Sequence, residues 1–231
     1  LAVVALDADN DGDEDLFVIP SHPTEAPYVI LNRGDGNLKY SERAILSDLA
    51  LMSGSWDDLS IGTISTFTGT DGVDKIILGF DDAATTMMLV SIPGSGTKAE
   101  WEAFPNLVMV SGTAAKNTKQ LMTIDLDGDG GQEILHLHDT GLDIMKTTDN
   151  GITWTLEKSL SIPAGATSFG VGHLDNSGGT GVRRGLDIVV GGGQEITVFF
   201  ADDFPVATGE SDPLLSEWGT STSTLTAAVP N

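Results

Sequence analysis

The chain has 231 residues, of which 40% are hydrophobic, and its 34 acidic and 11 basic residues give a formal net charge of −23. This length and apolar content suffice for the core of one large all-β domain or two small ones, whereas the charge disfavours nucleic acid and anionic membrane surfaces as partners. The absence of cysteine excludes disulfides and thiol chemistry, and no apolar run approaches the roughly 20 residues that a membrane-spanning helix needs.

The first 50 residues predict four short β-strands separated by turns. Residues 7–15 (DADNDGDED) form an acidic loop between the first two strands, and residues 31–38 supply a turn rich in Gly, Asp and Asn. The β-rich segments that carry no helical periodicity are 1–6, 16–19, 28–31 and 37–41.

The rest of the chain repeats this arrangement, with a second acidic loop at 125–133 (DLDGDGGQE). Weaker copies of the loop occur at 70–77 and 184–190. Further strands are predicted at 59–64, 75–80, 86–92, 120–124, 134–138, 142–146, 153–158, 167–172, 186–190 and 195–200.

The two acidic loops have the composition of calcium sites. Carboxylates at positions 1, 3, 5 and 9, with Gly12 or Gly130 at position 6 to permit a sharp turn, can direct six or seven oxygens onto one hard cation. Without a cation, two carboxylates about 4 Å apart repel by roughly 4 kcal/mol at an effective dielectric constant near 20. The carboxylate ligands expected at these positions are Asp7, Asp9, Asp11, Asp15, Asp125, Asp127, Asp129 and Glu133.

The last acidic residue of each loop copy reveals an internal repeat. These four anchor residues are spaced 59, 59 and 54 residues apart, and they are Asp15, Asp74, Glu133 and Asp187. A fixed period of this length indicates stacked or radially arranged units. Four strands per unit at this period predict a propeller blade.

A second turn motif supports the same fold. Residues 147–154 (TTDNGITW) resemble the Asp-box, a hairpin turn of sialidase-type propellers. This resemblance implies that Asp149 caps the turn and that Trp154 packs between strands.

Taken together, the strand, the DxDxDGxxDL loop and the LNxGDG turn resemble the FG-GAP or VCBS-type repeat of integrin-α-like β-propellers. The resemblance implies an all-β propeller of four-stranded antiparallel blades, with blades at roughly 1–50, 51–112, 113–165 and 166–231. Propellers of this family more often have seven blades. The four repeats therefore either close on themselves or form part of a larger propeller.

The resemblance also implies which loops hold calcium. The backbone carbonyls of Asp13 and Gly131 would supply the ligand at position 7 in the two acidic loops. In the second unit the ligand positions hold Ser65, Phe67 and Gly69, and in the fourth His173 and Ser177 replace carboxylates, so both loops are expected to have lost the metal. A third cation near Asp175 and Asp187 is the remaining option in the fourth unit.

Other interpretations of the motifs are weaker. An EF-hand would need Glu at loop position 12, where Val18 and His136 stand. His136 and His138 alternate on one strand face and could bind a transition metal, but no third ligand is near in sequence, which favours structural histidines. Residues 33–35 spell Arg-Gly-Asp, yet they lie within the repeat's own turn, where the arginine only fills a variable position.

The sequence therefore predicts a calcium-binding, non-catalytic extracellular module for adhesion or for binding a protein or glycan ligand. Free calcium outside the cell is high enough to fill weak sites. A lectin-like or carbohydrate-active propeller is the alternative, because exposed tryptophans in a pocket between blades could stack on sugars. The candidate tryptophans are Trp56, Trp101, Trp154 and Trp218.

An enzyme is less well supported by the sequence. A sialidase would need three clustered arginines, whereas two of the four arginines, Arg183 and Arg184, are adjacent in one loop. No order of Ser, His and Asp typical of a hydrolase stands out. A pair of carboxylates able to cleave glycosides remains open in so acidic a chain.

Overall fold

The described part of the chain consists of β-structure. The computed structural model describes residues 2–8, 11–20, 25, 27–32, 34, 38, 44–45, 61–69, 74–80, 87–91, 106–109, 117–147, 151, 154–174, 182–183, 186–192, 195–200, 204–205 and 222–226. Every regular element among them is a β-strand, which confirms the all-β class. None of these residues lies in a helix long and apolar enough to cross a membrane.

The described strands form four antiparallel four-stranded sheets and one small two-stranded sheet. The first sheet contains β1 (Ala2–Leu6), β2 (Asp15–Ile19), β3 (Tyr28–Ile30) and β4 (Ala44–Ile45). The second contains β5 (Ile61–Thr68), β6 (Asp74–Phe80), β7 (Met87–Ser91) and β8 (Asn106–Met109). The third contains β9 (Thr118–Ile124), β10 (Glu133–His138), β11 (Leu142–Thr147) and β12 (Trp154–Leu160). The fourth contains β13 (Ala166–Gly172), β15 (Asp187–Gly192), β16 (Glu195–Phe199) and β18 (Thr222–Thr226), and the small sheet contains β14 (Val182–Arg183) and β17 (Phe204–Pro205).

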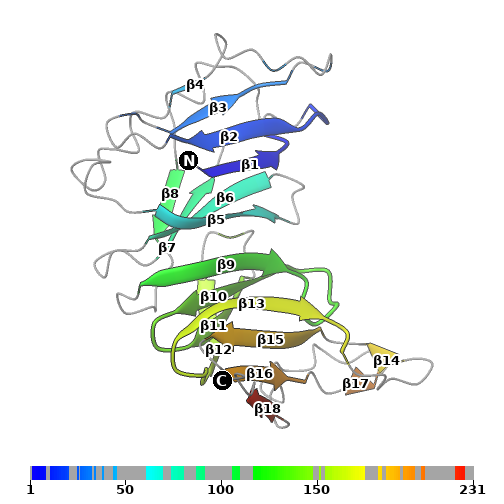
Figure 1. The fold of residues 1–231 in the computed structure, drawn as a ribbon. Helices are drawn as coiled ribbons and strands as arrows, with labels where there is room; N and C mark the ends of the chain where they lie inside the picture. Colours follow the sequence, from blue (N-terminus) through cyan, green and yellow to red (C-terminus); the bar gives the residue numbers. More distant parts are fainter. Residues whose placement is uncertain are drawn as a thin grey trace.

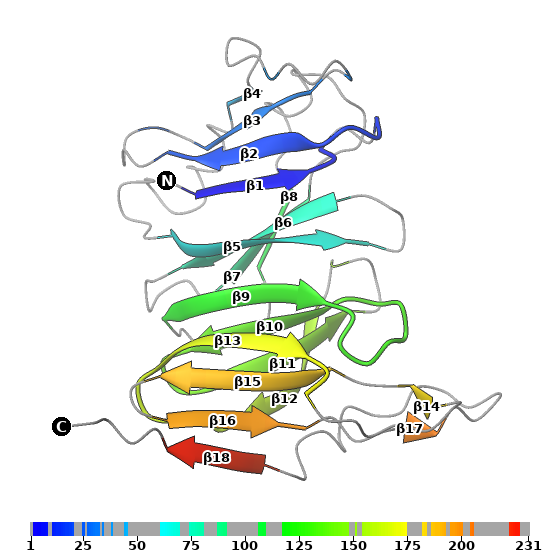
Figure 2. The same ribbon diagram turned by 45° about the vertical axis from the view of Figure 1, so that its right-hand side comes forward.

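The four larger sheets follow one another in a row in sequence order (Figures 1 and 2). Within the first three sheets, strands that are consecutive in the chain are neighbours. Between sheets, the first strands lie against one another, β1 with β5, β5 with β9, and β9 with β13. The first and fourth sheets lie at opposite ends of the row in both views.

The strand pairing confirms the repeat predicted from the four anchor residues. In each sheet the anchor is the first residue of the second strand and lies opposite the last residue of the first strand. The four pairs are Leu6 with Asp15, Thr68 with Asp74, Ile124 with Glu133, and Gly172 with Asp187. The acidic loops therefore join the first two strands of a sheet.

The predicted alignment of the second loop is wrong. Ser65 and Phe67 do not occupy loop positions, because both lie within β5, opposite Ile77 and Lys75 of β6. Only residues 69–73 separate β5 from β6, which is too short for a loop of nine ligand positions. The β-branched and aromatic run before the loop extends the strand instead of starting the turn.

Among the described residues, two hydrophobic cores lie between adjacent sheets. The third sheet is buried on both faces at β10, where every residue from 133 to 138 is buried. The core between the third and fourth sheets includes Leu126, Leu135, Leu137, Leu142, Ile144, Leu160, Ala166, Phe169, Ile188, Val190 and Phe199. The core between the second and third sheets includes Phe67, Ile77, Leu121, Ile134, Met145 and Trp154.

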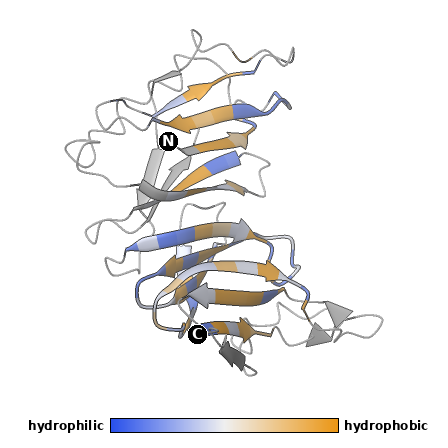
Figure 3. Ribbon diagram, viewed as in Figure 1, coloured by the Kyte–Doolittle hydropathy of each residue, from blue (hydrophilic) through white to orange (hydrophobic). Residues whose placement is uncertain are grey.

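Hydropathy follows the same division between strands and loops. In Figure 3, β2 and β3 are largely hydrophobic, whereas the turn that leads from β1 into β2 is hydrophilic. Three of the five residues of β2 are buried, namely Asp15, Phe17 and Val18. The acidic residues therefore gather at one end of a strand pair whose centre packs in the protein interior.

Trp154 is buried between the second and third sheets, as predicted. Its ring contacts Phe67 edge-on, with centroids 5.1 Å apart and an interplanar angle of 74°. Its Nε1 donates to the carbonyl of Gly151 at 3.0 Å, and the N–H of Gly151 donates to Thr147 Oγ1 at 3.0 Å. The turn motif thus has a structural role, although Asp149 lies outside the described residues.

Replacing Trp154 should strongly destabilise the fold. Trp154→Ala removes a fully buried aromatic side chain and leaves a cavity between two sheets, so we expect the free energy of unfolding to fall by about 3–5 kcal/mol. Trp154→Phe keeps most of the contact with Phe67 and should cost less. Denaturant unfolding of both variants measures this, and an alanine variant as stable as the parent chain would contradict the packing described.

Some strands were not predicted. The first sheet ends with β4, after the predicted strand at 37–41, of which only Leu38 is a described residue. β18 completes the fourth sheet by pairing with β16, at residues where the sequence pattern predicted no strand. β14 and β17 pair with each other outside the four larger sheets.

Candidate metal sites

The acidic loop between β9 and β10 brings three carboxylates together. Asp125, Asp127 and Glu133 each offer one oxygen, and these oxygens lie within 4.8 Å of one another. The loop turns this tightly because Gly128 and Gly130 have positive φ angles of 74° and 93°, which residues with a Cβ rarely adopt. The three carboxylates are placed so that they could hold a metal ion.

Two of these carboxylates each leave one buried oxygen without a hydrogen bond. The N–H of Gly130 donates to Asp125 Oδ2 at 3.0 Å, and the N–H of Leu126 donates to Glu133 Oε2 at 2.8 Å. In contrast, Asp125 Oδ1 and Glu133 Oε1 are buried and accept no hydrogen bond from any described residue. A buried acceptor without a partner costs about 1–3 kcal/mol, and a cation at these oxygens would remove that cost.

Lys146 of β11 already places a positive charge beside the loop, and sequence reasoning missed it. Its Nζ lies 2.6 Å from Asp129 Oδ2 and 3.2 Å from Asp127 Oδ2. The other oxygen of each carboxylate accepts a hydrogen bond from a backbone N–H group. The N–H of Asp129 donates to Asp127 Oδ1 at 3.0 Å, and the N–H of Gly131 donates to Asp129 Oδ1 at 2.6 Å. Only the strand register, which brings β11 beside β10, could have revealed this lysine.

Burial raises the pKa of two acidic groups of this loop, Glu133 and Asp127. Loss of solvation raises the pKa of Glu133 to about 8, although the hydrogen bond from Leu126 opposes the shift. Burial also raises the pKa of Asp127, opposed by the hydrogen bond from Asp129 and by Lys146. Without a bound cation, the loop therefore disfavours the carboxylate form that a metal requires.

Lys146 should compete with a cation for the loop. Lys146→Met keeps the length of the side chain and removes its charge, so Asp127 and Asp129 lose the ammonium that now neutralises them. We expect the calcium dissociation constant to fall by about tenfold, or about 1.4 kcal/mol. Calorimetric titration measures this change, with Lys119→Met as the matched control because Lys119 bonds the carbonyl of Ala166 instead. Weaker calcium binding in Lys146→Met would contradict competition.

The loop at 7–15 follows the same backbone pattern. Asp7 accepts hydrogen bonds from the N–H groups of Asp11 at 3.1 Å and Gly12 at 2.9 Å. The N–H of Asp13 donates to Asp11 Oδ1 at 2.9 Å. Asp9 lies outside the described residues, and the described carboxylates of this loop form no group of three ligand atoms as close as that at 125–133.

The carboxylate of Asp15 accepts more hydrogen bonds than that of its counterpart Glu133. Both of its oxygens accept hydrogen bonds from backbone N–H groups, Oδ2 from Ala8 at 2.9 Å and Oδ1 from Asn32 at 2.6 Å. Glu133 is held by the equivalent bond from Leu126 and has one oxygen left over. The anchor residue therefore closes the loop in both units, and the third unit retains more capacity for a ligand.

The anchors of the second and fourth units also serve the backbone. Asp74 accepts from Thr68 Oγ1 at 2.6 Å and from the N–H of Asp7 at 3.1 Å, which links the first two sheets. Asp187 accepts from the N–H of Leu174 at 2.7 Å. The anchors of the second and fourth units thus still accept hydrogen bonds at the junction of the first two strands, although the other predicted ligand positions of these units have changed.

Several predicted features lie outside the described residues. Asp175, the partner expected for a third cation, is one of them. So are Arg33 and Asp35 of the Arg-Gly-Asp tripeptide. The tryptophans in this group are Trp56, Trp101 and Trp218.

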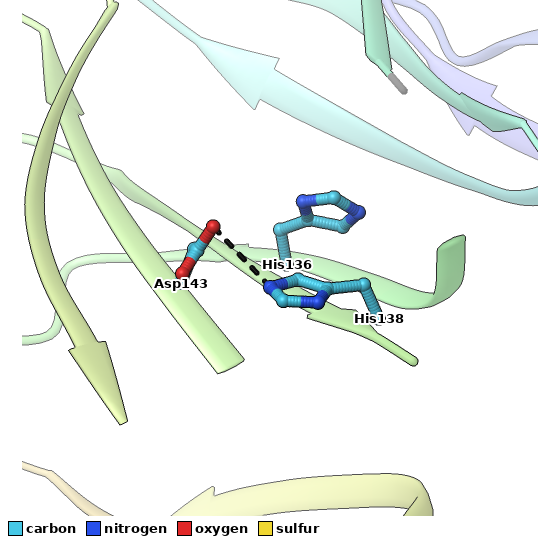
Figure 4. Close-up of side chains that lie close together, drawn as sticks. All are labelled: His136, His138 and Asp143. Atoms are coloured by element: carbon cyan, nitrogen blue, oxygen red, sulfur yellow. Dashed lines mark ion pairs between the residues drawn. The ribbon is translucent and has the colours of Figure 1, made fainter. Parts of the chain in front are cut away.

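The two histidines of β10 acquire a third neighbour that the sequence did not indicate. His136 and His138 lie with Asp143 of β11 in a buried group whose ligand atoms are within 4.8 Å of one another. Figure 4 shows the carboxylate of Asp143 directed at the ring of His138. The strand pairing places Asp143 opposite His136, so this contact depends on sheet register and not on proximity in sequence.

No family model matches the chain, and no curated protein is significantly similar to it in sequence.

Proposed function

We propose that this chain is a calcium-stabilised, non-catalytic module built from β-propeller blades, which binds a protein or glycan ligand outside the cell. The arrangement of the sheets supports the propeller part of this proposal. The first strand of each sheet lies against the first strand of the next, as blades do around a propeller axis. Because the first and fourth sheets lie at opposite ends of the row, we favour blades of a larger ring over a closed four-bladed propeller.

The observation that carries the calcium proposal is the pair of buried oxygens in the third unit. Asp125 Oδ1 and Glu133 Oε1 face a loop of carboxylates with no described hydrogen-bond donor for either of them. An all-oxygen site in a glycine-containing loop suits calcium better than zinc or other ions that prefer nitrogen and sulfur. Calcium would also offset the repulsion between Asp127 and Asp129.

Calcium in this loop would stabilise the fold. The loop joins β9 to β10, and β10 is buried on both faces. A cation that binds only the folded loop therefore adds its binding free energy to the stability of the third sheet. The loop at 7–15 is proposed as a second, weaker site, because both oxygens of Asp15 are already engaged.

Selectivity for calcium over magnesium tests the proposal. Magnesium demands near-ideal octahedral geometry at about 2.0–2.1 Å and dehydrates reluctantly, whereas a flexible loop accepts calcium at about 2.3–2.6 Å. We expect calorimetric titration of the chelated chain to show calcium binding that persists in excess magnesium. Absence of calcium binding, or equal competition by magnesium, would contradict a calcium loop.

The ligand-binding part of the proposal needs its own experiment. Binding of the chain to an array of glycans and extracellular proteins, with calcium and with chelator, should reveal a ligand that is retained only when calcium keeps the sheets folded. Trp154 does not favour the sugar-binding alternative, because it is buried between sheets. Turnover of a polysaccharide panel would overturn the non-catalytic part.

A further inference from the structure

A row of polar side chains crosses one face of the third sheet. Thr118, His136, His138 and Asp143 come from three adjacent strands, and each is at most 2% exposed. Ser159 of β12 extends the row, since its Oγ donates to Asp143 Oδ1 at 2.5 Å. Buried polar groups in place of hydrophobic residues cost stability unless they are satisfied.

This polar row faces the second sheet. On the same face of β10 and β11, Ile134 and Met145 pack with Phe67 and Ile77 of the second sheet. Gly79 of β6 comes so close that a Cβ built on it would collide with the methyl group of Thr118. The histidines are thus enclosed between two sheets, near the turn that carries the half-exposed Asp139.

The separation of His138 and Asp143 is long for a hydrogen bond. Nε2 of His138 lies 3.3 Å from Asp143 Oδ2, whereas N–H···O bonds usually measure about 2.7–3.2 Å. Two ligands about 2.0–2.1 Å from a tetrahedral ion lie about 3.3 Å apart. The pair therefore has the spacing of two ligands on one metal ion.

Each of the three side chains also contacts a hydroxyl that can orient it. Nε2 of His136 lies 2.9 Å from Thr118 Oγ1, and Nδ1 of His138 lies 3.1 Å from Thr140 Oγ1. Asp143 is held by Ser159. Metal-ligating histidines and carboxylates are typically fixed by such secondary hydrogen bonds.

We propose that His136, His138 and Asp143 form a structural binding site for a divalent transition ion of the zinc class, between the second and third sheets. Two imidazole nitrogens and one carboxylate oxygen suit zinc, cobalt or nickel, whereas calcium prefers oxygen ligands alone. The proposal is independent of calcium at 125–133. Because all three residues are buried, the ion would join β10 to β11 inside the protein.

Binding of the metal ion would move the proton of His138 from one ring nitrogen to the other without releasing it to solvent. In the metal-free chain the N–H of Thr140 donates to Nδ1 of His138 at 3.2 Å, so the neutral ring carries its proton on Nε2, which faces Asp143. On binding, the ion would take the place of that proton on Nε2, and the ring would carry its proton on Nδ1 instead. There Thr140 Oγ1 would accept the hydrogen bond, and the N–H of Thr140 would no longer donate to Nδ1.

Titration of the chelated full chain with zinc and with cobalt tests this site. Calorimetry should give one zinc equivalent bound through these residues, and cobalt should develop the visible absorption of a tetrahedral ion with nitrogen ligands. His138→Gln and Asp143→Asn should each weaken zinc binding by at least about a hundredfold, since each removes a ligand. His173→Gln is the matched control, because His173 is exposed and distant in sequence.

The variants must be compared as folded proteins. Circular dichroism in chelator should show folded chains, and Asp143→Asn retains an oxygen that can accept from Ser159. Glu133→Gln should leave zinc binding unchanged while it weakens calcium binding, which separates this site from the calcium proposal. If zinc binds equally well to His138→Gln and Asp143→Asn, or cobalt gives no tetrahedral spectrum with the parent chain, the proposal is overturned.

Discussion

Asp127→Ala is expected to remove most of the stabilisation that calcium gives to the third sheet. Asp127 is buried at position 3 of the loop and lies beside Asp125 and Glu133. At free calcium about 100 times the dissociation constant, one site contributes about 2.7 kcal/mol. For a chain of this size each kcal/mol shifts the melting temperature by about 2–4 °C, so the variant should melt about 5–10 °C lower in calcium.

The same experiment in chelator separates metal binding from other roles of Asp127. Without calcium the variant loses a hydrogen bond from the N–H of Asp129 and the contact with Lys146, which keeps its ion pair with Asp129. It also loses one of several like charges, so its melting temperature should differ much less from that of the parent. Glu157→Ala, at an exposed position of β12, is the matched control and should leave the calcium effect intact. Equal effects of Asp127→Ala with and without calcium would refute a calcium ligand at this position.

Calcium binding at 125–133 should strengthen as pH rises from 6 to 8. Burial raises the pKa of Glu133 to about 8 in the metal-free fold, from an ordinary value of 4.5. Because calcium needs the carboxylate, binding at lower pH must displace a proton. The dissociation constant should therefore increase by about tenfold for each pH unit below 8.

The metal-free chain should show the opposite dependence of stability on pH. A carboxyl group with a raised folded pKa holds its proton better in the folded state, so its contribution to stability declines as pH rises from about 4.5 through about 8. Melting curves in chelator and in calcium should consequently diverge toward pH 8. Glu133→Gln has no carboxyl group to titrate at this position. The variant should therefore lose the part of the pH-dependent difference between the two melting curves that Glu133 causes. A parent chain whose calcium affinity is the same at pH 6 and pH 8 would disprove the coupling.

The sequence predicted the fold well where local pattern decides it. The anchors Asp15 and Glu133 each follow an acidic loop and precede an apolar run, and that order is sufficient to place a strand on either side. The regular spacing of the anchors then predicted four equivalent sheets. Trp154 was also predictable, because its turn motif requires a buried aromatic residue.

Contacts that depend on strand register could not be predicted in the same way. Asp143 reaches the histidines, and Lys146 reaches the acidic loop, only because β11 pairs with β10 in one register. A shift of one residue would turn both side chains to the opposite face. Similarly, Ser65 and Phe67 were assigned to a loop because the extent of β5 is decided by its pairing with β6.

A crystal structure of the chain grown in calcium tests the central claim most directly. We predict an anomalous scattering peak in the loop at 125–133, with Asp125 Oδ1 and Glu133 Oε1 among its ligands at about 2.3–2.6 Å and with Lys146 Nζ withdrawn from Asp127. A loop that still contains Lys146 Nζ beside Asp127 and Asp129 at saturating calcium, with no peak at the two buried oxygens, would contradict the account.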